Sequence, residues 1–214
     1  MLPLAPEGFP YVLVPALAGI LAWVFGYPVV AVVLWLAMLA CLAFFRDPAR
    51  ASDAPPDVVL SPADGKVLSV GNAPAVIAGM GLPRQVSIFM SPANVHVNRA
   101  PISGTVREAR HTRGSKFPAY RDKASELNEH SFVLLEGAFG AVAYKQIAGA
   151  LARRVVCDLT PGQVVTRGDR VGLIKFGSRV DLFLPQRATI EVKQGERTRA
   201  GLTCVARLPS PEHA

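Results

Sequence analysis

Gly177-Ser178 is a dipeptide whose residue types allow a reaction within the chain itself. It lies between two apolar, β-branched runs, 171–175 and 180–184, so we expect it at a turn between strands. If the backbone is held strained there, the Ser178 hydroxyl can attack the Gly177 carbonyl, turn the amide into an ester and break the chain by β-elimination. The new N-terminus would be a pyruvoyl group, which can form a Schiff base with a substrate amine and withdraw electrons. Because most Gly-Ser dipeptides mark ordinary turns, other residues must carry the argument.

Two other stretches hold polar groups where a β core would not place them. Asp64 lies in the turn Ser61-Pro62-Ala63-Asp64-Gly65, and His96 and Asn98 alternate with valines along a strand-like segment. An Asp-Gly pair is most often a plain turn, and a lone histidine on a strand is most often structural. The functional interpretation makes Asp64 the carboxylate that orients an imidazole.

A third polar stretch, residues 116–130, lacks periodic apolar residues. A solvated loop is the simplest interpretation, and its length also fits a lid or a head-group-binding loop. Its cations would suit a phosphate, and its carboxylates would suit a substrate ammonium group.

Residues 1–45 read as a membrane anchor. No charged residue lies between Phe9 and Phe45, and the first basic residue is Arg46. Gly26-Tyr27-Pro28 divides this run into pieces of about 17 residues each, so either a helical hairpin or one kinked span fits. Because Arg46 and Arg50 follow the run and nothing basic precedes it, we expect the cell (inner) membrane, with the following domain on the cytoplasmic side.

The charge of the remaining chain favours an anionic surface. All 23 Lys and Arg follow residue 45, and of the 16 Asp and Glu only Glu7 precedes it, so residues 46–214 carry a net charge of +8. For a domain tethered at a bilayer, we expect acidic phospholipid rather than nucleic acid as the partner. The three cysteines have no zinc-binding spacing, so we expect no metal.

The composition after residue 45 predicts a linker over 46–57 and one domain over 58–214. Short β-branched runs separated by Gly and Pro predict a mainly β domain, a β-rich barrel or sandwich of the α+β type, with little helix outside the membrane segment. The expected strands are 58–60, 67–70, 75–77, 86–90, 104–107, 132–135, 141–147, 154–158, 171–175, 180–184 and 188–193.

Several stretches together resemble one family. SPADGKV, FMSPANVHVNRAPISGTV, KFPAYRDKASELNEH, QIAGALARRVVC and RVGLIKFGSRVDLFLP are similar, in this order, to the motifs of phosphatidylserine decarboxylase proenzymes of the short, membrane-associated prokaryotic type. The resemblance covers most of residues 58–193.

The resemblance implies self-cleavage between Gly177 and Ser178. The products would be a membrane-bound large subunit, residues 1–177, and a small subunit, residues 178–214, which remain together as a heterodimer open to further oligomerisation. Ser178 would become the pyruvoyl cofactor. The mature enzyme would convert phosphatidylserine to phosphatidylethanolamine and carbon dioxide.

The resemblance also implies residue roles. Asp64 and His96 match the pair that activates the serine, as in a Ser-His-Asp arrangement, and His96 would also reprotonate the substrate carbon. Longer relatives carry a second histidine three residues on, where this sequence has Arg99. The residues expected to hold the substrate phosphate or carboxylate are Asn98, Arg99, Lys123, Ser125, Glu126 and Asn128.

Two alternatives stay open at this level. PGQVVTRGDRVGLI also resembles the turn-and-strand pattern of lipoyl-like barrel-sandwich modules, which implies a membrane-tethered adaptor without enzymatic activity. Lys175, however, does not lie in the tight hairpin that such modules modify. The second alternative keeps the chemistry and changes the substrate to another serine-headed lipid, such as archaetidylserine.

Overall fold

The computed structural model describes residues 4–114, 128–149, 154–175 and 178–209. The chain forms two compact units, Met1–Ala49 and Arg50–Ala214. Residues 50–57, which we predicted as part of a linker, lie in the second unit. Each unit is described by itself.

The first unit is a helical hairpin. A 3-10 turn, η1 (Pro6–Gly8), leads into α1 (Phe9–Val24), and α2 (Pro28–Phe44) returns alongside it. Gly26 makes the turn with a φ of 81°, a conformation that glycine adopts without a steric penalty. Of the two predicted arrangements, the structure shows the hairpin.

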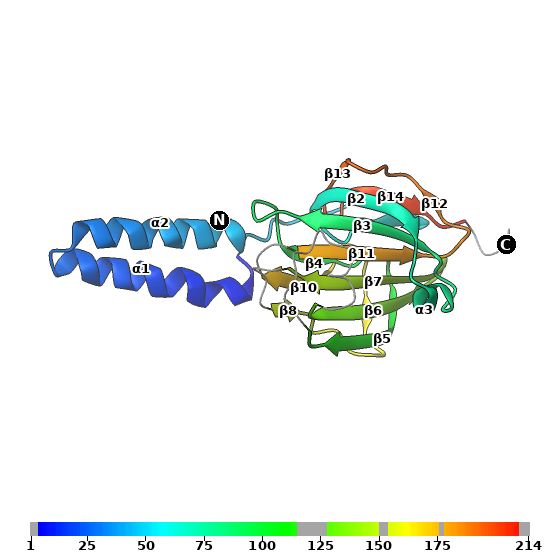
Figure 1. Ribbon diagram of the computed structural model, residues 1–214, viewed down its shortest axis with the longest axis horizontal. Helices are drawn as coiled ribbons and strands as arrows, with labels where there is room; N and C mark the ends of the chain where they lie inside the picture. Colours follow the sequence, from blue (N-terminus) through cyan, green and yellow to red (C-terminus); the bar gives the residue numbers. More distant parts are fainter. Residues whose placement is uncertain (1–3, 115–127, 150–153, 176–177, 210–214) are drawn as a thin grey trace. The chain divides into compact units, whose positions relative to one another are not determined.

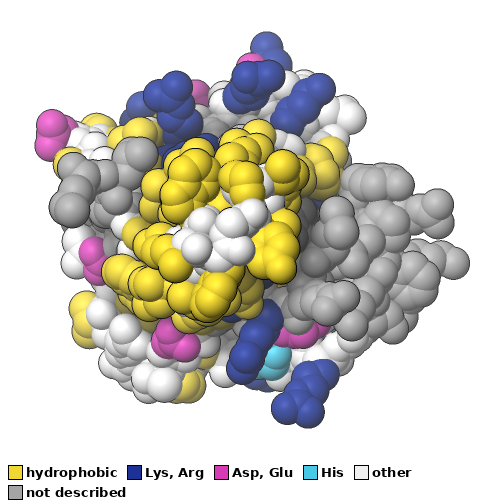
Figure 2. All heavy atoms as spheres, turned by 90° about the vertical axis from the view of Figure 1, so that its left-hand side faces the viewer, with side chains coloured by type: hydrophobic (Ala, Val, Ile, Leu, Met, Phe, Trp, Pro, Cys, Tyr) yellow, Lys and Arg dark blue, Asp and Glu magenta, His cyan; other side chains and the backbone are white. Residues whose placement is uncertain are grey.

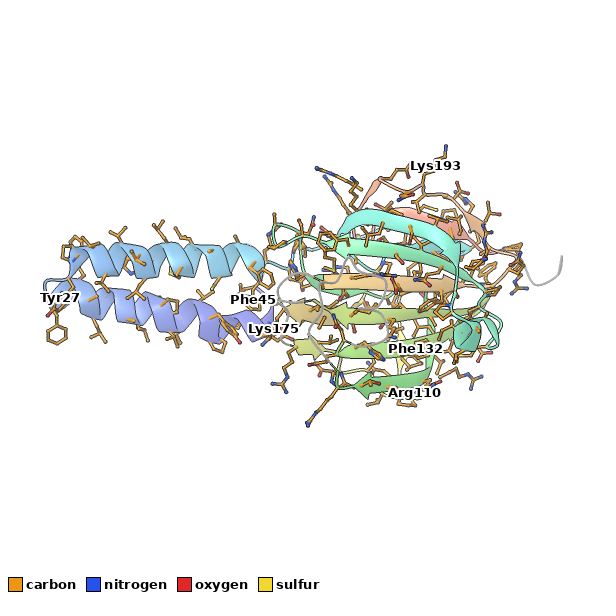
Figure 3. All side chains as sticks on the ribbon, viewed as in Figure 1. Tyr27, Phe45, Arg110, Phe132, Lys175 and Lys193 are labelled. Atoms are coloured by element: carbon orange, nitrogen blue, oxygen red, sulfur yellow. The ribbon has the colours of Figure 1, made fainter. Side chains whose placement is uncertain are left out.

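The surface of this hairpin is apolar. The helical stretch Pro6–Val24 is long and apolar enough to cross a membrane, by length and composition, and α2 is a shorter apolar helix. Most large hydrophobic side chains of both helices are exposed, such as Val24 and Val29. Figure 2 shows hydrophobic side chains gathered over this unit, and Figure 3 shows Tyr27 at the hairpin turn.

An eight-stranded antiparallel sheet dominates the second unit (Figure 1). Its strand order is β13-β2-β3-β11-β7-β6-β5-β9, so β11 lies in the middle, between β3 and β7. The strands are β2 (Gly65–Asn72), β3 (Arg84–Met90), β5 (Gly104–Thr112), β6 (His130–Gly137), β7 (Gly140–Ala148), β9 (Val164–Val165), β11 (Ser178–Leu184) and β13 (Arg197–Thr198).

Two three-stranded sheets complete this unit. One has the order β1-β14-β12 and the other β4-β10-β8. Their strands are β1 (Val58–Leu60), β14 (Cys204–Arg207), β12 (Thr189–Ile190), β4 (Val97–Arg99), β10 (Arg170–Lys175) and β8 (Arg154–Val156). The predicted mainly β class, with an apolar helical N-terminus, is confirmed.

Alternation along β11 divides its side chains between two clusters. Val180, Leu182 and Leu184 belong to the main hydrophobic core, whereas Phe183 packs in a smaller cluster with Phe132. Since neighbouring residues of a strand point to opposite faces, Ser178 shares the core-facing side with Val180.

One predicted strand is wrong. Residues 75–77 form the one-turn helix α3 (Ala75–Ala78), in which the amides of Ile77 and Ala78 donate to the Pro74 carbonyl. Three apolar residues fit either a strand or a helical turn, and the Pro74 that precedes them favours the turn here.

Candidate active site

Ser178 is the first residue of the central strand β11. Its register partners are Met90, the last residue of β3, and Ala148, the last residue of β7. The preceding strand β10 belongs to a different sheet and ends at Lys175, labelled in Figure 3. The chain therefore passes from one sheet to another immediately before Ser178.

The Ser178 side chain is completely buried and its hydroxyl is weakly held. Its Oγ donates a hydrogen bond to the Met90 sulfur, 3.3 Å away. A thioether is a weak acceptor, so less energy is needed to release this hydroxyl than to release one bonded to oxygen. The burial and the weak acceptor suit a serine that must leave its resting hydrogen bond to react.

His96 is also completely buried, just before β4. Its Nδ1 lies 3.0 Å from the Asn94 carbonyl oxygen. Because a carbonyl can only accept, Nδ1 carries the proton, and in the neutral ring the lone pair is then on Nε2. The imidazole thus has the tautomer of a base that acts through Nε2.

The Asp64 carboxylate is bound by Arg50. Arg50 Nη1 and Nη2 contact Asp64 Oδ1 and Oδ2 at 2.5 and 2.9 Å, and the Ala200 amide donates to Oδ1 at 2.7 Å. The two charged side chains are only 7% and 12% exposed. The Asn94 carbonyl is thus a partner of the His96 ring, and the bidentate contact fixes the Asp64 carboxylate. A role of Asp64 in orienting His96 stays a prediction.

Arg99 and Asn98 are hydrogen-bonded to the turn that carries Asp64. The Arg99 amide and the Asn98 side-chain amide both donate to the Pro62 carbonyl, and Arg99 Nη1 donates to the Gly168 carbonyl at 2.9 Å. Arg99 is 9% exposed and Asn98 is completely buried. Asn98 therefore contacts the protein interior, and Arg99 is the better placed of the two for a substrate anion.

Asn128 holds the strand next to Ser178. Its Nδ2 donates to the Ala148 carbonyl at 2.6 Å, and Ala148 is a register partner of Ser178. Burial lowers the pKa of the nearby His130; the hydrogen bond to the Asn128 carbonyl opposes this shift, and the charges of Lys145 and His111 add to it.

The structure places Asn128 at the Ser178 end of the main sheet. It places Asn98 and Arg99, on β4, against the turn that carries Asp64. Four other candidate residues, Gly177, Lys123, Ser125 and Glu126, lie outside the described residues.

A cavity of about 220 Å³ lies elsewhere, lined by the β6–β7 turn, residues 54 and 56, and Arg167. Gly140, in its lining, is eight residues along β7 from Ala148, or about 26 Å at 3.3 Å per residue. Within the described ranges, no group of three His, Cys, Asp or Glu is placed to hold a metal ion.

The ion pair between Arg50 and Asp64 was not predicted from the sequence. We counted Arg50 among the cations flanking the membrane segment, but its guanidinium is committed to Asp64 and to the Ala200 carbonyl. Nothing in the local pattern marked it, since it stands in a Pro- and Ala-rich stretch. Gln146 was missed as well, inside the apolar run that forms β7.

Comparisons with known proteins show to which family the chain belongs. The family model described as phosphatidylserine decarboxylase matches residues 38–206. The chain is 46% identical over 213 residues to a phosphatidylserine decarboxylase proenzyme of Magnetococcus marinus, with 97% of this chain and 96% of the relative covered. It is 43% identical over 212 residues to the corresponding proenzyme of Nitratidesulfovibrio vulgaris, with 99% and 97% covered. The chain belongs to the phosphatidylserine decarboxylase family.

Proposed function

We propose that this chain cleaves itself between Gly177 and Ser178 and then decarboxylates phosphatidylserine to phosphatidylethanolamine with the pyruvoyl group so formed. The relatives named as phosphatidylserine decarboxylase proenzymes support the substrate and a cleavage step. Family membership argues against the non-enzymatic adaptor.

The observation that carries the proposal is the position of Ser178. It is a fully buried serine at the start of the central strand, where the chain changes sheets, and its hydroxyl is held by a thioether. A pyruvoyl group keeps the three carbons of the serine and is uncharged. The surroundings, with Met90 and Ala148 as strand partners, suit such a neutral group.

Self-cleavage balances with water as the only co-reactant. The Ser178 oxygen bonds to the Gly177 carbonyl carbon, the peptide C–N bond breaks, and the hydroxyl proton ends on the released nitrogen. Loss of the Ser178 α-proton to a base then breaks the Cβ–O bond, which leaves a carboxylate on Gly177 and an enamine at residue 178. The enamine takes up a proton at Cβ to become an imine with a methyl group. Water replaces the imine nitrogen, which leaves as ammonia, and a ketone remains.

His96 is the base that we assign to the hydroxyl proton and the acid that returns a proton to the substrate carbon. Its Nδ1–H is fixed on the Asn94 carbonyl, so Nε2 is the atom that accepts and gives the proton. Arg99 supplies a buried guanidinium for the substrate carboxylate or phosphate. The pyruvoyl ketone supplies the electron-withdrawing centre that allows the carboxyl group to leave as carbon dioxide.

The two fragments would stay together after cleavage. β11 pairs along its length with β3 and β7, β13 pairs with β2, and β14 pairs with β1. β11, β13 and β14 of the small fragment thus pair with strands that precede Gly177 in the sequence. We infer a heterodimer anchored by the apolar hairpin in the cell membrane, with the basic domain on its cytoplasmic face.

Release of carbon dioxide from carboxyl-labelled phosphatidylserine in detergent micelles tests the proposal. The purified wild-type chain should release label, and Ser178→Ala should remain uncut and release none. An uncut protein that releases label would refute it. Archaetidylserine in parallel measures how much the lipid backbone matters.

A further inference from the structure

A line of hydrogen-bonded neutral side chains crosses the interior of the domain. Ser131 Oγ donates to Gln146 Oε1 at 2.6 Å, and Gln146 Nε2 donates to Asn98 Oδ1 at 2.8 Å. Asn98 Nδ2 in turn lies 3.3 Å from the Pro62 carbonyl oxygen. The line therefore joins β6, β7, β4 and the Asp64 turn.

This line ends at the same sulfur atom as the Ser178 hydroxyl. Asn98 Nδ2 is 3.6 Å from the Met90 sulfur, and Ser178 Oγ is 3.3 Å from it. Asn98, Gln146 and Ser178 are completely buried. The Asn98 amide and the Ser178 hydroxyl thus share one acceptor inside the core.

The orientation of both amides follows from the Pro62 carbonyl. This carbonyl can only accept, so the Asn98 NH2 group faces it and Asn98 Oδ1 faces Gln146. Gln146 must then present its own NH2 group to Asn98 and its oxygen to Ser131. Every dipole in the line points the same way, with the positive end toward Met90 and Ser178.

The backbone leaves room for this arrangement at Gly172. Its φ is +155°, and a Cβ atom there would come within 2.2 Å of the Val156 carbonyl oxygen and 2.9 Å of Gln146 Nε2. Apolar side chains of the same shape would fill such a core at little cost in stability. A buried polar line at this place therefore points to a role beyond packing.

We propose that Gln146 is a positioning residue for self-cleavage at Ser178, acting through Asn98. By holding the Asn98 amide with an N–H group on the Met90 sulfur, which is also the acceptor of the Ser178 hydroxyl, it places the positive end of a dipole near the oxygen on which negative charge develops as the hydroxyl proton leaves. Gln146 itself touches none of the reacting atoms. The inference rests on the proposed function and adds to it the group that prepares the nucleophile.

The test is the rate of self-cleavage of the full chain, followed on denaturing gels after a short pulse of cell-free synthesis with lipid vesicles. Gln146→Leu removes both hydrogen bonds of the amide and should slow cleavage about ten-fold. Gln85→Leu is the matched control, because Gln85 also donates to a serine, Ser87, but lies near the opposite end of β3 from Met90. It should cleave within two-fold of the wild-type rate.

Gln146→Glu separates positioning from packing. The ionised carboxylate accepts from Ser131 but has no proton for Asn98, whereas the protonated acid can do both. The ratio of its cleavage rate to that of Gln146→Leu should therefore rise several-fold as the pH falls from 8 to about 5.5. Both variants retain His96, so titration of that residue cancels in the ratio.

Two results would overturn the proposal: cleavage of Gln146→Leu as fast as Gln85→Leu, or a ratio that does not change with pH. If both Gln146 variants fail to fold, Ser131→Ala replaces them, since it removes only the far end of the line. A slowing of a few-fold would then support positioning, and an unchanged rate would refute it. Failure of the proposed function is distinct, because the wild-type chain itself would stay uncut.

Discussion

Removing the Arg50 side chain should destabilise the β domain far more than its place after the apolar hairpin implies. Arg50→Ala deletes a bidentate contact with Asp64 and a 2.7 Å hydrogen bond to the Ala200 carbonyl. It leaves a mostly buried carboxylate with the Ala200 amide as its remaining donor. Breaking one partner of a buried pair costs about 3–5 kcal/mol, and we take about 3 kcal/mol because Asp64 keeps that donor.

For a domain of this size, 1 kcal/mol shifts Tm by about 2–4 °C, so we expect a fall of about 6–12 °C. Thermal unfolding is followed by near-ultraviolet circular dichroism in a Ser178→Ala background, so that every chain is uncut. Arg207→Ala is the control, since its side chain is 48% exposed and 3.4 Å from Asp57. It should cost about 0.5 kcal/mol or less.

A double-mutant cycle identifies the partner. Asp64→Asn removes the charge that Arg50 neutralises, so Arg50→Ala should cost clearly less in that background than in the parent. Equal Tm values for Arg50→Ala and Arg207→Ala, or additive effects in the cycle, would refute the buried pair.

Three further predictions follow from single residues. His96→Gln should slow self-cleavage by about 10²-fold or more in the cell-free pulse, while His111→Gln, whose side chain is 46% exposed, cleaves normally; equal rates would remove His96 from the mechanism. Gly172→Ala should cost about 2–4 kcal/mol in chemical denaturation, because its Cβ would lie 2.2 Å from the Val156 oxygen; an unchanged midpoint would contradict the local geometry. Burial lowers the His130 pKa below 6.5, so its contribution to stability is present above pH 6.5 and is lost as the pH falls; His130→Gln should flatten that part of the stability curve, and an identical curve would contradict it.

The helical hairpin and most strands of the main sheet could be predicted, because each depends on a pattern of neighbouring residues. The uncharged run and its Gly26-Tyr27-Pro28 break predicted the hairpin as one of two arrangements, and β-branched runs predicted most strands of the main sheet. The run at 75–77 failed because three apolar residues carry no period.

The candidate site was predictable only where a residue type carries its own chemistry. Ser178 and His96 were singled out for that reason, and the structure buries both completely. The partners of Asp64 were not predictable, since Arg50 and Ala200 come from turn-rich stretches on either side of the domain in sequence. Gln146 was hidden because its neighbours depend on which strands pair, and pairing over such distances leaves no local signal.

Intact mass spectrometry of the freshly purified chain, with and without borohydride reduction, tests the central claim most directly. Self-cleavage predicts two fragments, residues 1–177 and 178–214, with the second carrying a blocked N-terminus whose ketone gains two hydrogens on reduction. A single uncut chain that still decarboxylates phosphatidylserine, or a fragment that begins with an intact serine, would contradict the account.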